Sequence, residues 1–275
     1  FYSMKTPISY YGGQQRVLKH IMPLIPEHDL YNEPFAGGAA LLFAKESAKI
    51  NAITDINGEL MNFYRTVVTD YVELNDEILK TLPSSEQYKM AEFVYRNPTL
   101  FSNVKRAWAV WVLSKMGFAG KLNGSYGYCK TGSDNMTRKV LNGKDLFCED
   151  LKAILEKCNM ENDHAFKVIN RYDTENTFHF LAPPYINTCN GHYDGLFEES
   201  DLLELLEIMA TLQGKFMLMM FPDKNIRKYA KKRGWNIHKI ERIITASKGK
   251  QRVQEEWLVC NYTAESIAHT DAEVE

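Results

Sequence analysis

The chain has 275 residues, of which 45% are hydrophobic, and a formal net charge of −2 at pH 7. This length and apolar content allow a full hydrophobic core, in one large domain or two unequal ones, and the near-zero charge argues against a protein that simply coats nucleic acid. No apolar run is long enough to span a membrane and the first residues carry no signal peptide, so we expect a cytoplasmic protein with no membrane partner.

Short apolar runs that alternate with amphipathic helical patterns predict an α/β fold with a mostly parallel sheet. The predicted strands cover residues 30–32, 52–54, 166–169, 178–181, 216–220, 236–242 and 257–261. Asn57 can cap the helix that follows the second of these strands, and Ser200 can cap a helix that continues to Met209.

The middle of the chain has a different pattern. Residues 72–112 show helical spacing and no strand, and residues 117–143 contain six glycines with aromatic and charged residues between them. We therefore predict a helical subdomain at 72–145 that ends in a long functional loop, inserted into one discontinuous domain made of 4–71 and 146–262.

Two further features limit the kinds of site that we expect. The five cysteines are scattered and form no C-x-x-C pair, so they are expected to be reduced, and the seven histidines show no zinc-binding spacing, so no metal site is expected. The acidic, apolar-poor residues 263–275 are predicted to be a disordered tail.

Basic residues are concentrated in the predicted insert. Between Ser102 and Asp145, eight basic residues stand against two acidic ones, a local net charge of +6. The eight are Lys105, Arg106, Lys115, Lys121, Lys130, Arg138, Lys139 and Lys144. A second basic run extends from Lys224 to Arg233. Charge runs are usually solvated faces, but a patch of this size suits contact with phosphates.

The segment YNEPFAGGAALLFAKES, residues 31–47, places small residues between a short strand and a helix. Such a turn lets a ligand approach the backbone, although a Gly-Gly turn also serves packing alone. Asp55 ends the next strand, eighteen positions after Gly37, where doubly wound folds hold a ribose through its hydroxyls. The pair favours a nucleoside-type cofactor over simple packing.

Near the start, ISYYGGQQRVLKHI places Tyr10, Tyr11, Gly12 and Gly13 just before a helix that opens at Gln14. Free N–H groups at such a helix start can bind a carboxylate. Taken alone, this segment is better explained as an ordinary glycine-bearing turn.

FHFLAPPYINT, residues 178–188, runs a core strand into two prolines and a tyrosine. The prolines fix the backbone and offer no N–H, so the carbonyls ahead of them are rigid acceptors at the carboxyl end of a strand, beside a stacking ring. This combination suits a flat heterocycle that carries an amino group, and a base must leave the duplex to reach such a pocket.

Together these segments resemble the Dam-type DNA adenine methyltransferases. YYGGQQR, NEPFAGGAA, TDIN, FHFLAPPYINT and EEWLVCNY occur in the order and spacing of that family, and the resemblance extends from Lys5 to Tyr262. It implies a Rossmann-like methyltransferase fold, S-adenosylmethionine as cofactor, and methyl transfer to the exocyclic amine of an adenine flipped out of double-stranded DNA. It leaves open a cognate restriction endonuclease as a further partner.

The resemblance also implies roles for individual residues. The cofactor-binding positions are Tyr11, Gly12, Gly13 and Gln14 near the methionine carboxylate, the loop of Pro34, Phe35, Ala36, Gly37 and Gly38, and Asp55 at the ribose hydroxyls. Asp163 corresponds less closely to a position beside the adenine of the cofactor. The catalytic motif is Ala182, Pro183, Pro184 and Tyr185.

DNA contacts are expected from the insert. The basic residues expected at phosphates are Lys105, Arg106, Lys121, Lys130, Arg138 and Lys139, and the polar residues expected at base edges are Asn123, Ser125 and Tyr126.

Two positions depart from the family pattern. The family usually has Asp, sometimes Asn or Ser, at the position of Ala182, and close relatives usually have Lys at the position of Gln14. The missing acidic group is the acceptor that draws the adenine amine toward sp³ geometry. Losing one such group typically costs about 100- to 1000-fold in rate, so this chain is expected to have little or no methyl transfer.

Three alternatives remain at the level of sequence. The chain can be a catalytically dead DNA-binding regulator that keeps the fold, or a methyltransferase that acts on the exocyclic amine of cytosine, although Tyr185 favours adenine. A dinucleotide-dependent dehydrogenase shares Asp55, but it lacks a G-x-G-x-x-G fingerprint and leaves Ala182-Pro183-Pro184-Tyr185 unexplained.

Overall fold

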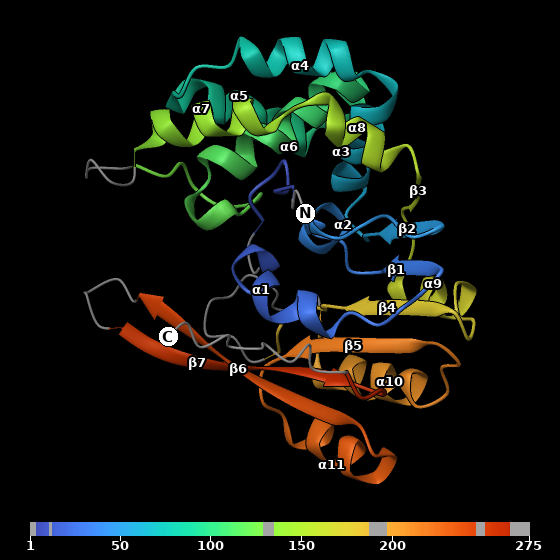
Figure 1. Ribbon diagram of the computed structural model, residues 1–275. Helices are drawn as coiled ribbons and strands as arrows, with labels where there is room; N and C mark the ends of the chain where they lie inside the picture. Colours follow the sequence, from blue (N-terminus) through green and yellow to red (C-terminus); the bar gives the residue numbers. More distant parts are fainter. Residues whose placement is uncertain (1–3, 11–12, 129–134, 187–196, 246–250, 265–275) are drawn as a thin grey trace, which may run out of the picture.

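The computed structural model of the chain describes residues 4–10, 13–128, 135–186, 197–245 and 251–264. Its strands form one sheet in the order β3-β2-β1-β4-β5-β7-β6, in which β1 to β5 pair in parallel and β7 runs antiparallel to both β5 and β6 (Figure 1). The strands are β1 (Leu30–Glu33), β2 (Ile50–Thr54), β3 (Cys158–Glu161), β4 (Thr177–Leu181), β5 (Lys215–Met220), β6 (Asn236–Thr245) and β7 (Gln251–Cys260). The Rossmann-like α/β fold predicted from the sequence is confirmed.

One predicted strand is wrong and one strand was missed. Residues 166–169 lie in helix α9 (Ala165–Arg171), whose buried residues Ala165, Val168 and Ile169 follow helical spacing. The periodicity of so short an apolar run does not show whether it forms a strand or a helix. The missed strand, β3, is an edge strand whose residues are only partly buried, so it has no continuous apolar run.

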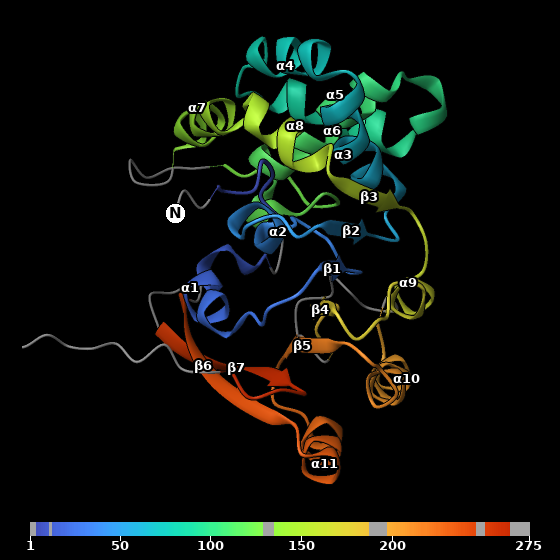
Figure 2. The same ribbon diagram turned by 45° about the vertical axis from the view of Figure 1, so that its right-hand side comes forward.

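Helices cover both faces of the sheet. Alternate side chains of each strand point to opposite faces, so each strand contributes to two buried clusters. Phe216, Leu218 and Met220 of β5 belong to one buried cluster, with α9, α10 (Glu199–Met209) and α11 (Lys224–Arg233). Met217 and Met219 point to the other cluster, which includes α1 (Leu18–Ile21) and α2 (Ala40–Ala44). Figure 2 shows these two sets of helices on opposite sides of the sheet.

A helical layer lies beyond the β3 edge, at the top of Figure 1. Its members are α3 (Gly58–Thr69), α4 (Tyr71–Leu79), α5 (Ser85–Arg96), α6 (Asn103–Met116), α7 (Met136–Leu146) and α8 (Glu149–Leu155). The helical prediction for residues 72–112 is confirmed, but the predicted glycine-rich loop is shorter than expected because α7 begins at Met136. Trp111 of α6 and Phe178 of β4 belong to the same buried cluster, so the hydrophobic core continues from the helical layer into the sheet. The predicted domain boundaries at residues 72 and 145 remain a prediction.

The two predicted caps have different outcomes. Asn57 caps α3, and its side-chain oxygen accepts hydrogen bonds from the backbone N–H groups of Glu59 (3.0 Å) and Leu60 (3.2 Å). Ser200 is not a cap, because α10 begins at Glu199 and Glu198 forms a capping box with Asp201.

The remaining elements are short 3-10 turns: η1 (Gln14–Arg16), η2 (Met22–Leu24), η3 (Pro98–Leu100) and η4 (Phe118–Gly120). Three cysteines, Cys148, Cys158 and Cys260, are free thiols as predicted, whereas Cys129, Cys189 and residues 265–275 lie outside the described residues. No helix in the described part of the chain has the length and apolar character to cross a bilayer.

Candidate functional site

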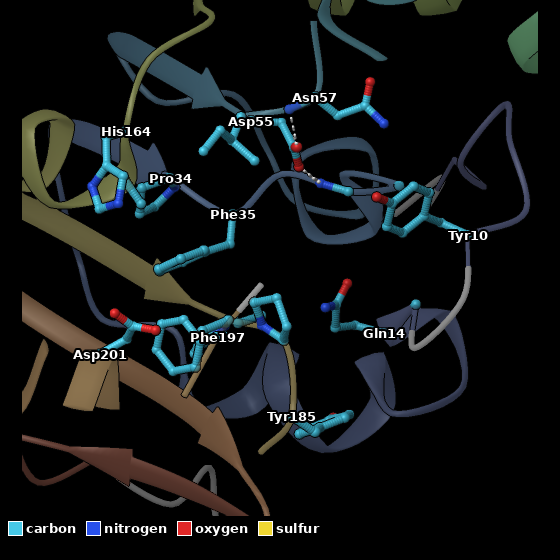
Figure 3. Close-up of a pocket in the computed structure, with 18 of the residues that line it drawn as sticks. Tyr10, Gln14, Pro34, Phe35, Asp55, Asn57, His164, Tyr185, Phe197 and Asp201 are labelled. Atoms are coloured by element: carbon cyan, nitrogen blue, oxygen red, sulfur yellow. Dashed lines mark hydrogen bonds between the residues drawn. The ribbon is translucent and has the colours of Figure 1, made fainter. Parts of the chain in front are cut away.

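A cavity of about 420 Å³ lies where the loops after β1, β2 and β4 meet (Figure 3). These parallel strands end at Glu33, Thr54 and Leu181, so the segments that follow them gather at one edge of the sheet, the usual ligand-binding edge of such folds. The residues that line it are Tyr10, Gly13, Gln14, Pro34, Phe35, Gly37, Gly38, Asp55, Ile56, Asn57, Asn123, His164, Ala165, Phe166, Ala182, Pro183, Pro184, Tyr185, Phe197 and Asp201.

One side of the cavity, which we call the loop wall, consists of Gly37, Gly38, Asp55 and Asn57. The carboxylate of Asp55 accepts hydrogen bonds from the backbone N–H of Gly37 and from that of Asn57, both at 2.9 Å. The carbonyl of Gly37 accepts a bond from the hydroxyl of Tyr64 at 2.6 Å, and the carbonyl of Gly38 accepts one from Thr6. Three side chains from different segments, those of Thr6, Asp55 and Tyr64, therefore fix the backbone of the loop wall.

The backbone of the loop wall requires glycine at one position. Gly37 has φ +48, in the left-handed region, and a Cβ there would come within 3.0 Å of the ring of Tyr10. This close packing places the ring of Tyr10 on the loop, and Figure 3 shows it beside the bonds of Asp55.

Burial is the main cause of the pKa shifts at and beside the loop wall. It raises the pKa of Asp55, although the two backbone N–H donors oppose the shift. Directly before the loop, burial raises the pKa of Glu33 to about 8, and the hydroxyl of Tyr31 donates to its carboxylate at 2.8 Å. Burial lowers the pKa of nearby Lys45 to about 8.

The opposite side, which we call the motif wall, consists of Ala182, Pro183, Pro184 and Tyr185. It begins where the fully buried strand β4 ends. The ring of Tyr185 stacks on Phe221, with centroids 4.0 Å apart and planes 16° apart, so one face of the phenol ring is already covered. The motif wall therefore presents apolar surface and one aromatic ring, with a methyl group at position 182.

Aromatic and apolar side chains close the cavity between the two walls. Phe35 and Phe197 meet edge to face with centroids 6.1 Å apart, and His164 meets Phe166 in the same way at 4.8 Å. Figure 3 shows Asp201 beside Phe197 at this end.

The structure brings together most of the predicted cofactor and catalytic positions. Gly13, Gln14, Pro34, Phe35, Gly37, Gly38, Asp55 and all four motif residues line the cavity. Ala36 is buried beneath the loop, and Tyr11 and Gly12 lie outside the described residues. Asp163 does not line the cavity, because its carboxylate pairs with Arg171 at 3.0 Å and accepts the N–H of His164.

The predicted DNA contacts are distributed over several environments. Lys105 pairs with Glu77 at 2.8 Å and Arg106 makes two hydrogen bonds to Glu59, at 2.6 and 2.9 Å. Lys115, which was part of the charge count but not a predicted contact, is buried, which lowers its pKa to about 8. The local charge of +6 is therefore not one exposed surface.

The other predicted contacts are nearer to the cavity or more exposed. Asn123 lines the cavity itself, Ser125 is exposed, and the ring of Tyr126 packs against Tyr88 and Tyr128. Lys121, on the same loop, is half-buried, and Arg138 and Lys139 are exposed on α7. Lys130 lies outside the described residues.

Several lining residues had not been predicted from the sequence: Tyr10, Ile56, Asn57, His164, Ala165, Phe166, Phe197 and Asp201. Ile56 and Asn57 directly follow Asp55, so their place was open to prediction. His164 to Phe166 follow β3, and they were missed because that strand was missed.

Comparisons with known proteins agree on one family. Residues 10–246 match the model of the D12 class N6 adenine-specific DNA methyltransferase family. The chain is 27% identical to the type II methyltransferase M.MjaIII of Methanocaldococcus jannaschii, over 94% of this chain and 99% of that protein. It is 26% identical to the type II methyltransferase M1.LlaDCHI of Lactococcus lactis, over 91% and 93%, and 24% identical to the DNA N-6-adenine-methyltransferase of Escherichia phage P1, over 82% and 31%.

Proposed function

The chain belongs to the D12 class N6 adenine-specific DNA methyltransferase family, and we propose that its cavity holds S-adenosylmethionine at the loop wall and an adenine, flipped out of DNA, at the motif wall. The observation that carries this proposal is that a single cavity joins Gly37 and Asp55 to Ala182 and Tyr185. A donor and an acceptor bound at the two walls would be neighbours.

The loop wall fits the cofactor that the family uses. Each carboxylate oxygen of Asp55 accepts one backbone N–H, which leaves acceptor capacity on both for the hydroxyls of a ribose. The absence of a Cβ at Gly37 and Gly38 lets Tyr10 pack closely on the loop, so its aromatic ring lines the cavity beside Asp55. When bound, S-adenosylmethionine supplies a methyl group on a positively charged sulfur.

The motif wall fits an adenine ring but lacks one group for the reaction. The lone pair of the exocyclic amine is delocalised into the ring, so the amine needs an acceptor that withdraws its N–H and offsets the positive charge that develops. Ala182 provides only a methyl group. The loss of one such group typically costs about 100- to 1000-fold in rate, or roughly 3–4 kcal/mol. The chain is therefore proposed to bind cofactor and DNA while transferring methyl groups very slowly.

The family match favours adenine over the cytosine alternative. The names of two relatives as type II methyltransferases support a cognate restriction endonuclease as partner. A DNA-binding regulator is the second candidate, because position 182 carries alanine while the other residues of both walls still line one cavity.

The test is the Ala182→Asp protein, incubated with S-adenosylmethionine and adenine-containing duplex DNA. We expect methylated adenine, detected by sequencing that reports modified bases, at least about 100-fold above the unchanged chain. The double variant Ala182→Asp, Asp55→Ala is the control, which should lose the signal. A folded Ala182→Asp protein that binds cofactor and DNA but methylates nothing would favour the regulator.

A further inference from the structure

Helix α11 carries one face made of cations. Lys224, Arg227, Lys228, Lys231 and Lys232 follow the spacing i, i+3, i+4, i+7 and i+8, so they share one side of the helix, which we call the α11 basic face. All five are exposed, whereas Ile226 and Ala230 on the opposite side are buried against the sheet. None of the proposed roles of the cavity uses this face.

The charges of the α11 basic face are little compensated. Lys224 lies 3.4 Å from Glu199, but both side chains are well exposed, at 80% and 56%, so the pair is weak. Among the described residues, no ion pair reaches Arg227, Lys228, Lys231 or Lys232, and Arg227 lies over the ring of Trp257 at 5.3 Å. Lys105 and Arg106 of the predicted DNA patch are, by contrast, already paired.

Helix stability does not account for this face. Cations in the last turn interact favourably with the helix dipole, which suits Lys231 and Lys232. Lys224 and Arg227 stand near the first turn, where the dipole disfavours cations, and Lys224, Lys228 and Lys232 are like charges at i, i+4 spacing, which also destabilises the helix. An arrangement with these costs fits a surface that meets an anionic partner.

The position of α11 relative to the cavity indicates which partner. Phe221, which stacks on Tyr185 of the motif wall, is followed two residues later by Asp223, the N-cap of α11. The basic face begins at Lys224, close to this contact, and extends for about 12 Å along the helix, away from the cavity edge of the sheet. In Figure 1, α11 and the helical layer lie at opposite ends of the sheet, and the strands whose loops line the cavity, β1, β2 and β4, lie between them.

We infer that the α11 basic face binds the phosphate backbone of the duplex that flanks the target adenine. This inference rests on the proposed function, since it takes the cavity as the place of the flipped base. Duplex DNA carries one negative charge per about 1.7 Å of its axis, so a row of cations of this length meets several phosphates. A lipid surface is disfavoured, because the apolar side of α11 is buried and a membrane-bound helix inserts its apolar side.

The test compares two triple variants of the full chain that remove the same charge. Lys224→Gln, Arg227→Gln, Lys228→Gln removes the half of the basic face that begins next to the motif wall. Lys49→Gln, Lys157→Gln, Lys215→Gln is the control, because these exposed lysines begin or precede β2, β3 and β5, at the edge of the sheet opposite the cavity. Binding to a fluorescent 30-base-pair duplex is measured by anisotropy over a series of salt concentrations.

We expect the α11 variant to bind DNA at least about tenfold more weakly, and the slope of log K against log salt to fall by about 0.9 for each phosphate that the helix no longer neutralises. The control variant should keep the slope of the unchanged chain. A third variant, Lys224→Arg, Arg227→Lys, Lys228→Arg, keeps the charge and should bind DNA as the unchanged chain does, which excludes misfolding as the cause.

Equal slopes for the α11 and control variants would overturn the inference, as would weaker binding to anionic lipid vesicles together with unchanged binding to DNA. Cofactor affinity, measured by calorimetry, separates this failure from that of the proposed function. It should be the same in all variants, and a chain that binds no S-adenosylmethionine would refute the proposed function instead.

Discussion

The two walls of the cavity differ in how they are built. The loop wall is fixed by side-chain hydrogen bonds to its backbone: Asp55 accepts the N–H groups of Gly37 and Asn57, and the hydroxyls of Tyr64 and Thr6 donate to the carbonyls of Gly37 and Gly38. The motif wall is fixed by proline geometry and by the stacking of Tyr185 on Phe221. A wall held by buried polar bonds loses its shape when one partner is removed, whereas a wall held by covalent stiffness keeps its shape when a side chain is shortened.

This difference explains why an alanine at position 182 is compatible with an intact cavity. In the proposed function, the side chain there contributes to the chemistry of the motif wall and little to its geometry. Substitutions in the loop wall should therefore change binding and stability, and substitutions at position 182 should change rate.

The largest effect is expected from the series Ala182→Asp, Ala182→Asn and Ala182→Ser. The rate of methyl transfer should rise most for Asp, about 100- to 1000-fold, because a carboxylate both accepts the amine N–H and offsets its charge. Asn and Ser only accept, so they should give smaller gains. Cofactor affinity measured by calorimetry should stay within about threefold across the series, and a large change would contradict the separation of the two walls.

The next effect is expected from Asp55→Ala. It leaves the N–H groups of Gly37 and Asn57 without their acceptor, at about 1–3 kcal/mol for each buried group, and it removes the proposed ribose ligand. S-adenosylmethionine should bind about 10- to 100-fold more weakly. The control is Asp163→Ala, since Asp163 follows the neighbouring strand but does not line the cavity, and its cofactor affinity should be nearly unchanged.

A pH dependence is expected from Glu33, which is buried directly before the loop wall. Its pKa is about 8 in the folded chain, above its ordinary value, so between about pH 4.5 and pH 8 the folded state holds a proton that the unfolded state has released. The free energy of unfolding should therefore fall as pH rises through this window, by up to about 1.4 kcal/mol per pH unit.

Urea denaturation at several pH values checks this expectation. Glu33→Gln should remove the slope that Glu33 causes, so its stability advantage should grow from pH 5 to pH 8. Lys45 does not obscure the test below about pH 7, because a pKa of about 8 leaves it charged in both states there. Parallel pH profiles for the two proteins would contradict the burial of Glu33.

The smallest effect is expected from Tyr64→Phe. It removes the hydroxyl that donates to the carbonyl of Gly37 at 2.6 Å and should cost about 1 kcal/mol of stability. Tyr88→Phe is the matched control, because the buried hydroxyl of Tyr88 has no hydrogen-bond partner among the described residues, so its removal should be neutral or slightly stabilising. Equal destabilisation by both substitutions would show that the bond to Gly37 contributes nothing.

The sequence by itself determined the elements whose signals are local. Strands with continuous apolar runs, such as β4 and β5, the cap at Asn57 and the helical character of residues 72–112 were all predictable, because burial on both faces and capping leave their mark on neighbouring residues. Gly37, Asp55 and residues 182–185, which line the cavity, could also be singled out from the sequence, since each follows or ends a predicted strand.

Only the tertiary structure decided the rest. The half-exposed edge strand β3, the helix at residues 165–171 and the pairing of Lys105 and Arg106 depend on what packs beside them, and a charge count along the chain does not reveal which cations are paired. For the same reason, the meeting of Asp55 with Ala182 in one cavity, and the placing of α11 beside it, follow from the order of the strands in the sheet and not from any segment alone.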